Sequence, residues 1–375
     1  MNLADKKQLK SYNKGERNMF KKISIFGIIF VMAFTLTAAA SNLMVDKALD
    51  KEKAITMTIA HPETPDPLNF IHSAALKFKK YVEETSKGKI TVNIAPGGQL
   101  GDSAEMPKQI QMGAIEGSMS MAEGHIAPYY KGIQVLAIPY LFLSVDHALY
   151  TLDVDTPFGK KIWGDLEKKT GLKVLAIWDN GGFRCFTNNK RPIKSPADMK
   201  GLKIRTMQIP AHMEMVKALG ANPTPIAWTE LYNALQLNVV DGQENAVPTI
   251  ALGHINEVQK YLTLDRHVYS NHIFPVNAKW FNGLPDVYQL IIQQGAAKAS
   301  ETARRMTRIQ RSTLLNQFRK GGMEIYDPSP EEAALFREAA QAPVLKFIRE
   351  EVGDELVDEL LKASDNSLRE LGYVK

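Results

Sequence analysis

The sequence is poor in cysteine: Cys185 is the only one among 375 residues, which excludes a disulfide framework within the chain. With 25 glycines and 19 prolines it is neither collagen-like nor of low complexity, and 45% hydrophobic residues exclude general disorder. Beyond residue 40 there is no apolar run of roughly 18 residues, so we expect the rest of the chain to be soluble. The length favours two domains, or one large one, with enough core to fold unaided.

Excess charge is also missing once the first 40 residues are set aside. The formal net charge is +5, but residues 1–40 hold seven basic and two acidic side chains, which leaves 39 of each sign in the remainder. A neutral protein has no overall electrostatic attraction to nucleic acid or anionic lipid. Four arginines at 304, 305, 308 and 311 leave a nucleic-acid-binding or surface-binding protein as an alternative, although they fit a solvated helix face better.

Sequence signatures of catalysis are absent as well. The chain has no phosphate-binding glycine loop, no HExxH, CxxC or EF-hand pattern, and no Gly-x-Ser-x-Gly elbow. Its eight histidines are scattered, so we expect neither a metal nor a cofactor. These absences favour a binding protein over an enzyme. The alternative is an exported α/β hydrolase or lyase that uses Glu244 and an arginine for acid–base chemistry on a carboxylate substrate.

Residues 1–40 are typical of an export signal. Lys21 and Lys22 precede the apolar segment ISIFGIIFVMAF (23–34), and three alanines end at Ala40, where we expect cleavage. An uncleaved membrane anchor is the alternative. A second signal-like start at Met19 leaves open whether translation begins there or at Met1.

Beyond the leader, the hydrophobic periodicity alternates between strands and helices. Strands are predicted at residues 55–60, 89–95 and 173–178, with helices at 68–84, 103–113 and 155–171 between them. A turn is predicted at 179–182, before further strand-like segments. This alternation indicates an α/β fold with mostly parallel strands. A helix over 286–319 would span roughly 50 Å, so it has to cross both halves of the molecule.

Two arginines stand in strand-like segments, Arg184 among apolar residues and Arg205 at the end of a strand. An arginine at the carboxyl end of a strand can hold a carboxylate through two parallel hydrogen bonds. Taken alone, both are better interpreted as solvated arginines.

Downstream of these arginines, Trp228 and Tyr232 could belong either to the hydrophobic core or to a binding site. Glu244 and Asn245 could either cap the following helix or belong to a binding site.

Several motifs in fixed order carry a resemblance to a known family. They are GQLG (98–101), IPYLF (138–142), PIKSPADMKGLKIR (192–205), GANPTP (220–225), ELYNALQ (230–236) and VDGQEN (240–245). Together they resemble the solute-binding subunits of tripartite ATP-independent periplasmic (TRAP) transporters, the C4-dicarboxylate-binding family. The resemblance spans residues 55–330.

The resemblance implies a two-lobe periplasmic-binding-protein fold with a hinge and one long helix spanning both lobes. Lobe I would comprise residues 55–181 and 270–305, and lobe II residues 182–269 and 306–375. The chain would cross between the lobes near 179–182 and 265–271, and ligand would bind in the cleft.

The resemblance also implies a set of ligand-binding residues. Arg205 matches the arginine that pairs with the ligand carboxylate, Arg184 a second cleft arginine, Asn245 the cleft asparagine and Trp228 an aromatic that packs on the ligand. By position in the chain, contacts are further expected from His61, Met121, Glu123, Tyr232 and Glu244. Residues 118–125 contain no arginine, which argues against sialic acid as ligand.

The implied function is that of a periplasmic protein that captures a small organic acid. It would deliver this acid to a small and a large integral membrane subunit of a TRAP transporter. No cofactor, metal, nucleic acid or catalysis is implied.

Overall fold

The computed structural model describes residues 47–374. The predicted export signal and both candidate start positions lie outside these residues. The chain divides into two compact units, residues 1–53 and 54–375. Of the first unit, residues 47–49 form a helical turn. Within the described range, no helix is both long enough and apolar enough to cross a bilayer.

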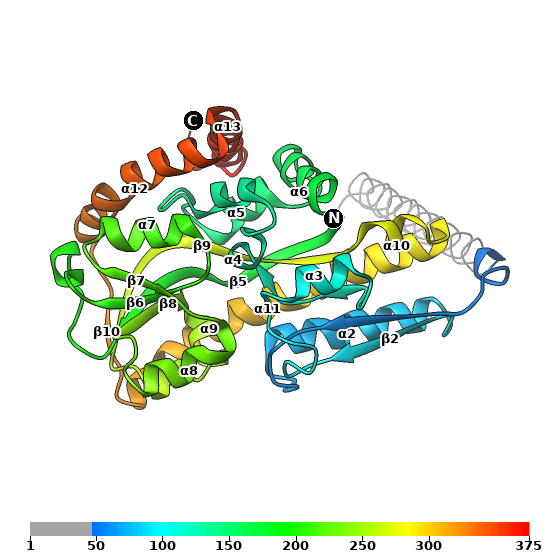
Figure 1. The fold of residues 1–375 in the computed structure, drawn as a ribbon, viewed down its shortest axis with the longest axis horizontal. Coiled ribbons are helices and arrows are strands. Elements are labelled where there is room, and N and C mark those ends of the chain that lie inside the picture. Colours follow the sequence, from blue (N-terminus) through cyan, green and yellow to red (C-terminus); the bar gives the residue numbers. More distant parts are fainter. Residues whose placement is uncertain (1–46, 375) are drawn as a thin grey trace, which may run out of the picture. The chain divides into compact units, whose positions relative to one another are not determined.

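The second unit is built on one sheet, which has ten strands within the described range and the order β2-β1-β3-β9-β5-β8-β6-β7, with β4 and β10 also paired to β9 (Figure 1). The strands are β1 (Ile55–Ala60), β2 (Ile90–Ala95), β3 (Gly117–Ser118), β4 (Met121–Ala122), β5 (Leu172–Asn188), β6 (Lys203–Thr206), β7 (Asn222–Pro225), β8 (Gly242–Ala246), β9 (Tyr261–Asn277) and β10 (Glu324–Tyr326). The predicted strands at 55–60 and 89–95 are confirmed as β1 and β2.

Two strands of 17 residues each, β5 and β9, run through the middle of this sheet. They pair antiparallel from Leu172 opposite Asn277 to Asn188 opposite Tyr261. The prediction of mostly parallel strands was therefore wrong at the centre of the sheet. Parallel pairing is found on both sides of it, between β1 and its neighbours β2 and β3, and between β6 and its neighbours β7 and β8.

The predicted turn at 179–182 was also wrong, because β5 continues through it. The register with β9 shifts between Asp179 and Gly182, where β5 has extra residues. Gly181 and Gly182 have φ angles of 82° and 98°, a conformation that glycine adopts without strain. The glycine pair therefore marks a bulge within a continuous strand, not its end.

Helices occupy most of the remaining chain: α2 (Phe70–Thr85), α3 (Met106–Gln111), α4 (Glu123–Ile126), α5 (Val145–Leu152), α6 (Pro157–Thr170), α7 (Pro210–Ala218), α8 (Trp228–Gln236), α9 (Val247–Leu252), α10 (Ala278–Asn282), α11 (Asp286–Lys320), α12 (Pro330–Val352) and α13 (Asp354–Glu370). Within residues 47–374 there are three short 3-10 helices, η1 (Lys131–Ala137), η2 (Pro196–Met199) and η3 (Ile255–Glu257). The predicted helices at 68–84 and 155–171 are confirmed, the one at 103–113 is shorter, and α5 and α13 were not predicted.

The predicted long helix is confirmed as α11, with 35 residues (yellow to orange in Figure 1). It contacts α2, β5 and α9. Close to the bulge of β5, Thr307 Oγ1 donates to Asp179 Oδ2 at 2.8 Å and Arg311 donates to the carbonyl of Gly181 at 3.2 Å. The helix is thus attached to β5 where that strand is most irregular. The lobe boundaries stay a prediction, because β5 and β9 pass through both of the predicted lobes.

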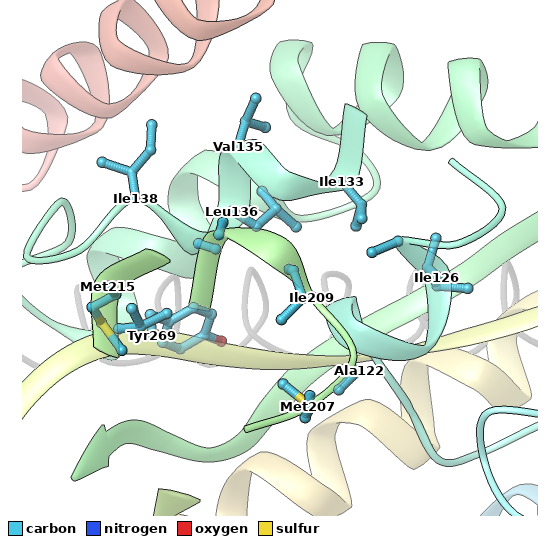
Figure 2. Close-up of a cluster of buried hydrophobic side chains, with 14 of the residues drawn as sticks. Ala122, Ile126, Ile133, Val135, Leu136, Ile138, Met207, Ile209, Met215 and Tyr269 are labelled. Atoms are coloured by element: carbon cyan, nitrogen blue, oxygen red, sulfur yellow. The ribbon is translucent and has the colours of Figure 1, made fainter. Parts of the chain in front are cut away.

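A buried apolar cluster joins segments that are far apart in the sequence (Figure 2). It brings Ile126 and Leu136 of the first half together with Ile209 and Met215 of the second half. The apolar run at 133–143 belongs to this cluster, and its first part is the 3-10 helix η1. Helices α12 and α13 (orange to red in Figure 1) complete the packing against α7, η1 and α5.

Candidate functional site

A small cavity, with a volume of about 30 Å³, collects side chains from both ends of the sheet. Its charged or imidazole groups are Arg205, Glu63, His125 and His272. Its hydroxyl and amide groups come from Ser103, Ser120, Asn180, Asn245 and Thr249. Its apolar part consists of Ala122, Met207, Trp228 and Leu252. Such a mixture of one cation, several polar groups and one aromatic ring is suited to a small polar ligand.

Arg205 is the cation of this cavity. It lies in β6, opposite Thr224 of β7 and Gln243 of β8, and its residue surface is only 2% exposed. Its Nε donates to the carbonyl of Ile226 at 2.9 Å, and no carboxylate of residues 47–374 lies within ion-pair distance. Burial lowers the pKa of Arg205 to about 10, so the guanidinium stays charged at neutral pH. A buried cation without a counter-ion is costly, and an anion in the cavity would relieve that cost.

Asn245 and Trp228 line the cavity together with Arg205. In β8, Asn245 pairs with Cys185 of β5, and its amide nitrogen donates to Gln243 Oε1 at 2.7 Å, which fixes the orientation of the side chain. Trp228 begins α8, and its ring packs so closely on Gly253 that a Cβ there would lie 2.6 Å from the ring. Both residues are therefore held in place by the protein itself.

Arg184, the second predicted arginine, does not line this cavity. It and Glu244 occupy diagonal positions on the β5–β8 pair, and both side chains are fully buried. Arg184 Nε donates to Glu244 Oε2, Nη2 donates to Oε1 at 2.9 Å, and Nη1 donates to Ser270 Oγ at 3.1 Å. The guanidinium is thus occupied by an internal partner.

The same carboxylate is shared with a histidine. His267 Nε2 lies 3.2 Å from Glu244 Oε2, and its Nδ1 lies 2.8 Å from Asp265 Oδ2. Burial alone would raise the pKa of Glu244, but Arg184 and His267 hold it well below its usual range. Burial lowers the pKa of His267, yet the carboxylates of Asp265 and Glu244 outweigh this and raise it to about 9.

Glu123 and His212 complete what we call the buried ionic cluster, namely Arg184, Glu244, His267, Asp265, Glu123 and His212. The two nitrogens of His212 lie 4.0 Å from Glu123 Oε1 and 3.8 Å from Glu244 Oε1. Burial raises the pKa of Glu123 to about 7 and lowers that of His212 to about 3. Around neutral pH the cluster therefore contains two cations, Arg184 and His267, and the ionised carboxylate of Glu244 between them.

The remaining predicted residues lie outside the cavity lining. His61 is buried behind it, with Nε2 3.1 Å from His72 Nδ1. Met121 is part of the core and pairs with Ile273 across β4 and β9. Tyr232 is half-buried on α8, and its hydroxyl donates to Glu257 at 3.4 Å. Of the predicted set, the structure brings Arg205, Asn245 and Trp228 together in the cavity.

Several lining residues were not predicted, among them Glu63, Asn180, His125 and His272. Asn180 lies in the bulge of β5, which had been interpreted as a turn, and His272 lies opposite Trp178 within β9. Only Glu63 had a usable signal, because it follows the first strand two residues after His61.

Comparisons with known proteins identify the family of this chain. A model of the bacterial extracellular solute-binding protein family 7 matches residues 61–351. The chain belongs to this family. This family 7 protein is 34% identical to the 2,3-diketo-L-gulonate-binding periplasmic protein YiaO of Escherichia coli K12 over 254 residues. The aligned residues make up 68% of this chain and 76% of the relative.

Solved structures place the family 7 protein among TRAP solute-binding proteins. The sugar acid binding protein DctPAm from Advenella mimigardefordensis, in complex with galactonate, matches with a TM-score of 0.79 and 31% identity over 84% of this chain and 99% of that one. A TRAP periplasmic solute binding protein from Ochrobactrum anthropi matches with a TM-score of 0.75 and 35% identity. The match covers 85% of this chain and 97% of that one. The resemblance to TRAP solute-binding subunits and the two-lobe fold predicted from it are therefore confirmed.

The buried ionic cluster predicts how the stability of this family 7 protein depends on pH. The pKa of His267 is raised to about 9 from an ordinary 6.5, so its stabilising contribution is complete below pH 6.5 and is lost as the pH rises through 9. We expect the free energy of unfolding to fall over this range, by on the order of 3 kcal/mol from this group. Urea unfolding between pH 7.5 and 9.5 measures this fall in the free energy of unfolding. The range is chosen because it lies above the pKa of Glu123, which is about 7.

The matched variant for this measurement is His267→Gln, which keeps a polar side chain but does not titrate. Its free energy of unfolding should change much less between pH 7.5 and 9.5 than that of the unmodified protein. Equal slopes for the two proteins would show that His267 does not carry the proton.

Proposed function

We propose that this protein captures an organic acid in the cavity, with the ligand carboxylate on Arg205, and delivers it to the membrane subunits of a TRAP transporter. The observation that carries the proposal is the buried guanidinium of Arg205 without a carboxylate partner among residues 47–374. Asn245 and Trp228, from β8 and α8, would hold and cover the ligand beside it.

The ligands in the names of similar proteins indicate which acids deserve testing first. YiaO binds 2,3-diketo-L-gulonate and DctPAm was solved with galactonate, and both are acids that carry several oxygen substituents. The hydroxyl and amide groups in the cavity offer matching hydrogen-bond partners. We therefore place sugar acids and related hydroxy acids at the head of the candidate ligands.

Location and lack of catalysis are part of the proposal. The export signal predicted at residues 1–40 would send the protein to the periplasm, where relatives such as YiaO are found. The alternative of a hydrolase or lyase required Glu244 as an acid–base group. Its carboxylate lies outside the cavity lining and is occupied by Arg184 and His267, which argues against that role.

A thermal-shift screen of organic acids tests the proposal. A ligand present at 100 times its dissociation constant stabilises the folded protein by about 2.7 kcal/mol, which raises the melting temperature by several degrees. We expect a rise with one or more acids and none with the corresponding neutral sugar or alcohol, because only the acid can pair with Arg205.

Product analysis after prolonged incubation belongs to the same experiment. The acid should be recovered unchanged. A screen in which no organic acid stabilises the protein, or in which the bound acid is converted, would contradict the proposed function.

A further inference from the structure

Glu63 is a second charged group in the cavity, and its carboxylate is only partly used by the protein. The residue is 6% exposed and lies in the segment that follows β1. Its backbone carbonyl accepts from the amide of Gly97 at 2.7 Å, which ties this segment to the loop after β2. Its Oε1 accepts from Ser120 Oγ, also at 2.7 Å.

The other oxygen, Oε2, is buried and has no hydrogen-bond donor within residues 47–374. His61 Nδ1 lies 3.4 Å from this oxygen, within ion-pair distance, but the two atoms form no hydrogen bond. The opposite nitrogen of His61 is engaged with His72. An ionised carboxylate has acceptor sites only, and a buried acceptor without a donor costs free energy. A ligand in the cavity would remove this cost if it brought a hydrogen-bond donor.

We propose that Glu63 is a specificity-determining residue, which selects acids bearing a hydrogen-bond donor in addition to the carboxylate and rejects dicarboxylates. The inference rests on the proposed function, because the carboxylate of the ligand is assigned to Arg205. The donor is a hydroxyl or an ammonium group. A second carboxylate in the ligand would meet the like charge of Glu63 in a buried cavity, where such repulsion is stronger than in bulk water.

Arg205 and Glu63 thereby divide the task of recognition. Arg205 holds the group that all candidate acids share, and Glu63 distinguishes among them by the remainder of the molecule. Ser120 keeps Oε1 of Glu63 occupied, so that Oε2 is the oxygen left for the ligand.

The experiment is calorimetric titration with four kinds of acid that differ in the group opposite the carboxylate. They are a polyhydroxy monocarboxylate such as galactonate, an amino acid, a dicarboxylate such as succinate, and a simple aliphatic monocarboxylate. We expect the unmodified protein to bind the hydroxy acid or the amino acid at least about tenfold more tightly than the other two, since a hydrogen bond to a charged group has about this effect. The better of the first two identifies the donor as hydroxyl or ammonium.

Glu63→Gln tests the residue itself, because it keeps the shape of the side chain and removes its charge. The variant should bind the preferred acid about tenfold more weakly and succinate more tightly than the unmodified protein does. Glu84→Gln is the matched control, since Glu84 is 67% exposed on α2, and it should leave all four affinities unchanged. Circular dichroism verifies that both variants are folded, and the selectivity of the unmodified protein tests the inference without any variant.

The outcomes separate this inference from the proposed function. Binding of succinate as tight as that of the hydroxy acid, or a Glu63→Gln variant with unaltered selectivity, overturns the role of Glu63 while an acid-binding cavity stands. If the unmodified protein binds none of the acids, the proposed function itself has failed.

Discussion

Replacing Arg205 by alanine should weaken the binding of the preferred acid by at least about 30-fold. The reason is that the carboxylate would enter a desolvated cavity without its cation, and loss of one partner of a buried charged pair costs roughly 2–5 kcal/mol. Isothermal titration calorimetry with the acid found in the screen measures the change. Arg205→Lys should not restore the affinity, because an ammonium group cannot form two parallel hydrogen bonds to a carboxylate.

Arg337→Ala provides the control for this measurement. Arg337 is exposed on α12, so its loss changes the net charge by the same amount without touching the cavity. If Arg205→Ala binds as tightly as Arg337→Ala, Arg205 does not hold the ligand and the proposed orientation of the acid is wrong.

The largest effect on stability is expected from Glu244→Ala. The change leaves Arg184 and His267 buried without the carboxylate that lies between them, and removal of one partner of a buried ion pair costs about 3–5 kcal/mol. Urea unfolding followed by circular dichroism should therefore show a midpoint at much lower denaturant concentration. Replacing Arg184 and Glu244 together by apolar residues of similar size should recover part of the loss, because the unpaired guanidinium is removed and His267 keeps Asp265 as its partner.

A surface pair provides the comparison. Glu350 lies 3.9 Å from Lys346 on α12, with side chains that are 65% and 79% exposed. Glu350→Ala should change the free energy of unfolding by less than about 1 kcal/mol. Equal losses in Glu350→Ala and Glu244→Ala would mean that the buried ion pair contributes no more to stability than the exposed one.

The elements that could be predicted from the sequence are those whose signal is local. The stripes of α2 and α6 follow the helical period, and α11 runs from just after Pro285 to just before a pair of glycines. The continuity of β5 could not be predicted, because Gly181 and Gly182 mark a turn as readily as a bulge. Only the pairing with β9 on both sides of them decides between the two.

The cavity shows the same division. Arg205, Asn245 and Trp228 could be proposed because motifs of the second half of the chain match a family in order and spacing. Asn180 and His272 enter the cavity through the bulge of β5 and the register of β9, which are tertiary features without a local signature. Arg184 illustrates the opposite case, in which an arginine in a strand has an internal partner that no pattern of residues announces.

The solitary thiol of Cys185 has a practical consequence. Cys185 lies in β5 and is only 1% exposed, and burial raises the pKa of its thiol to about 12. Because maleimides and similar reagents react with exposed thiolates, this position should stay silent during labelling. Cysteines introduced at the surface can then carry a donor and an acceptor dye without prior removal of the native one. Single-molecule fluorescence would then test whether the two predicted lobes open and close, in a protein whose own sequence is otherwise unaltered.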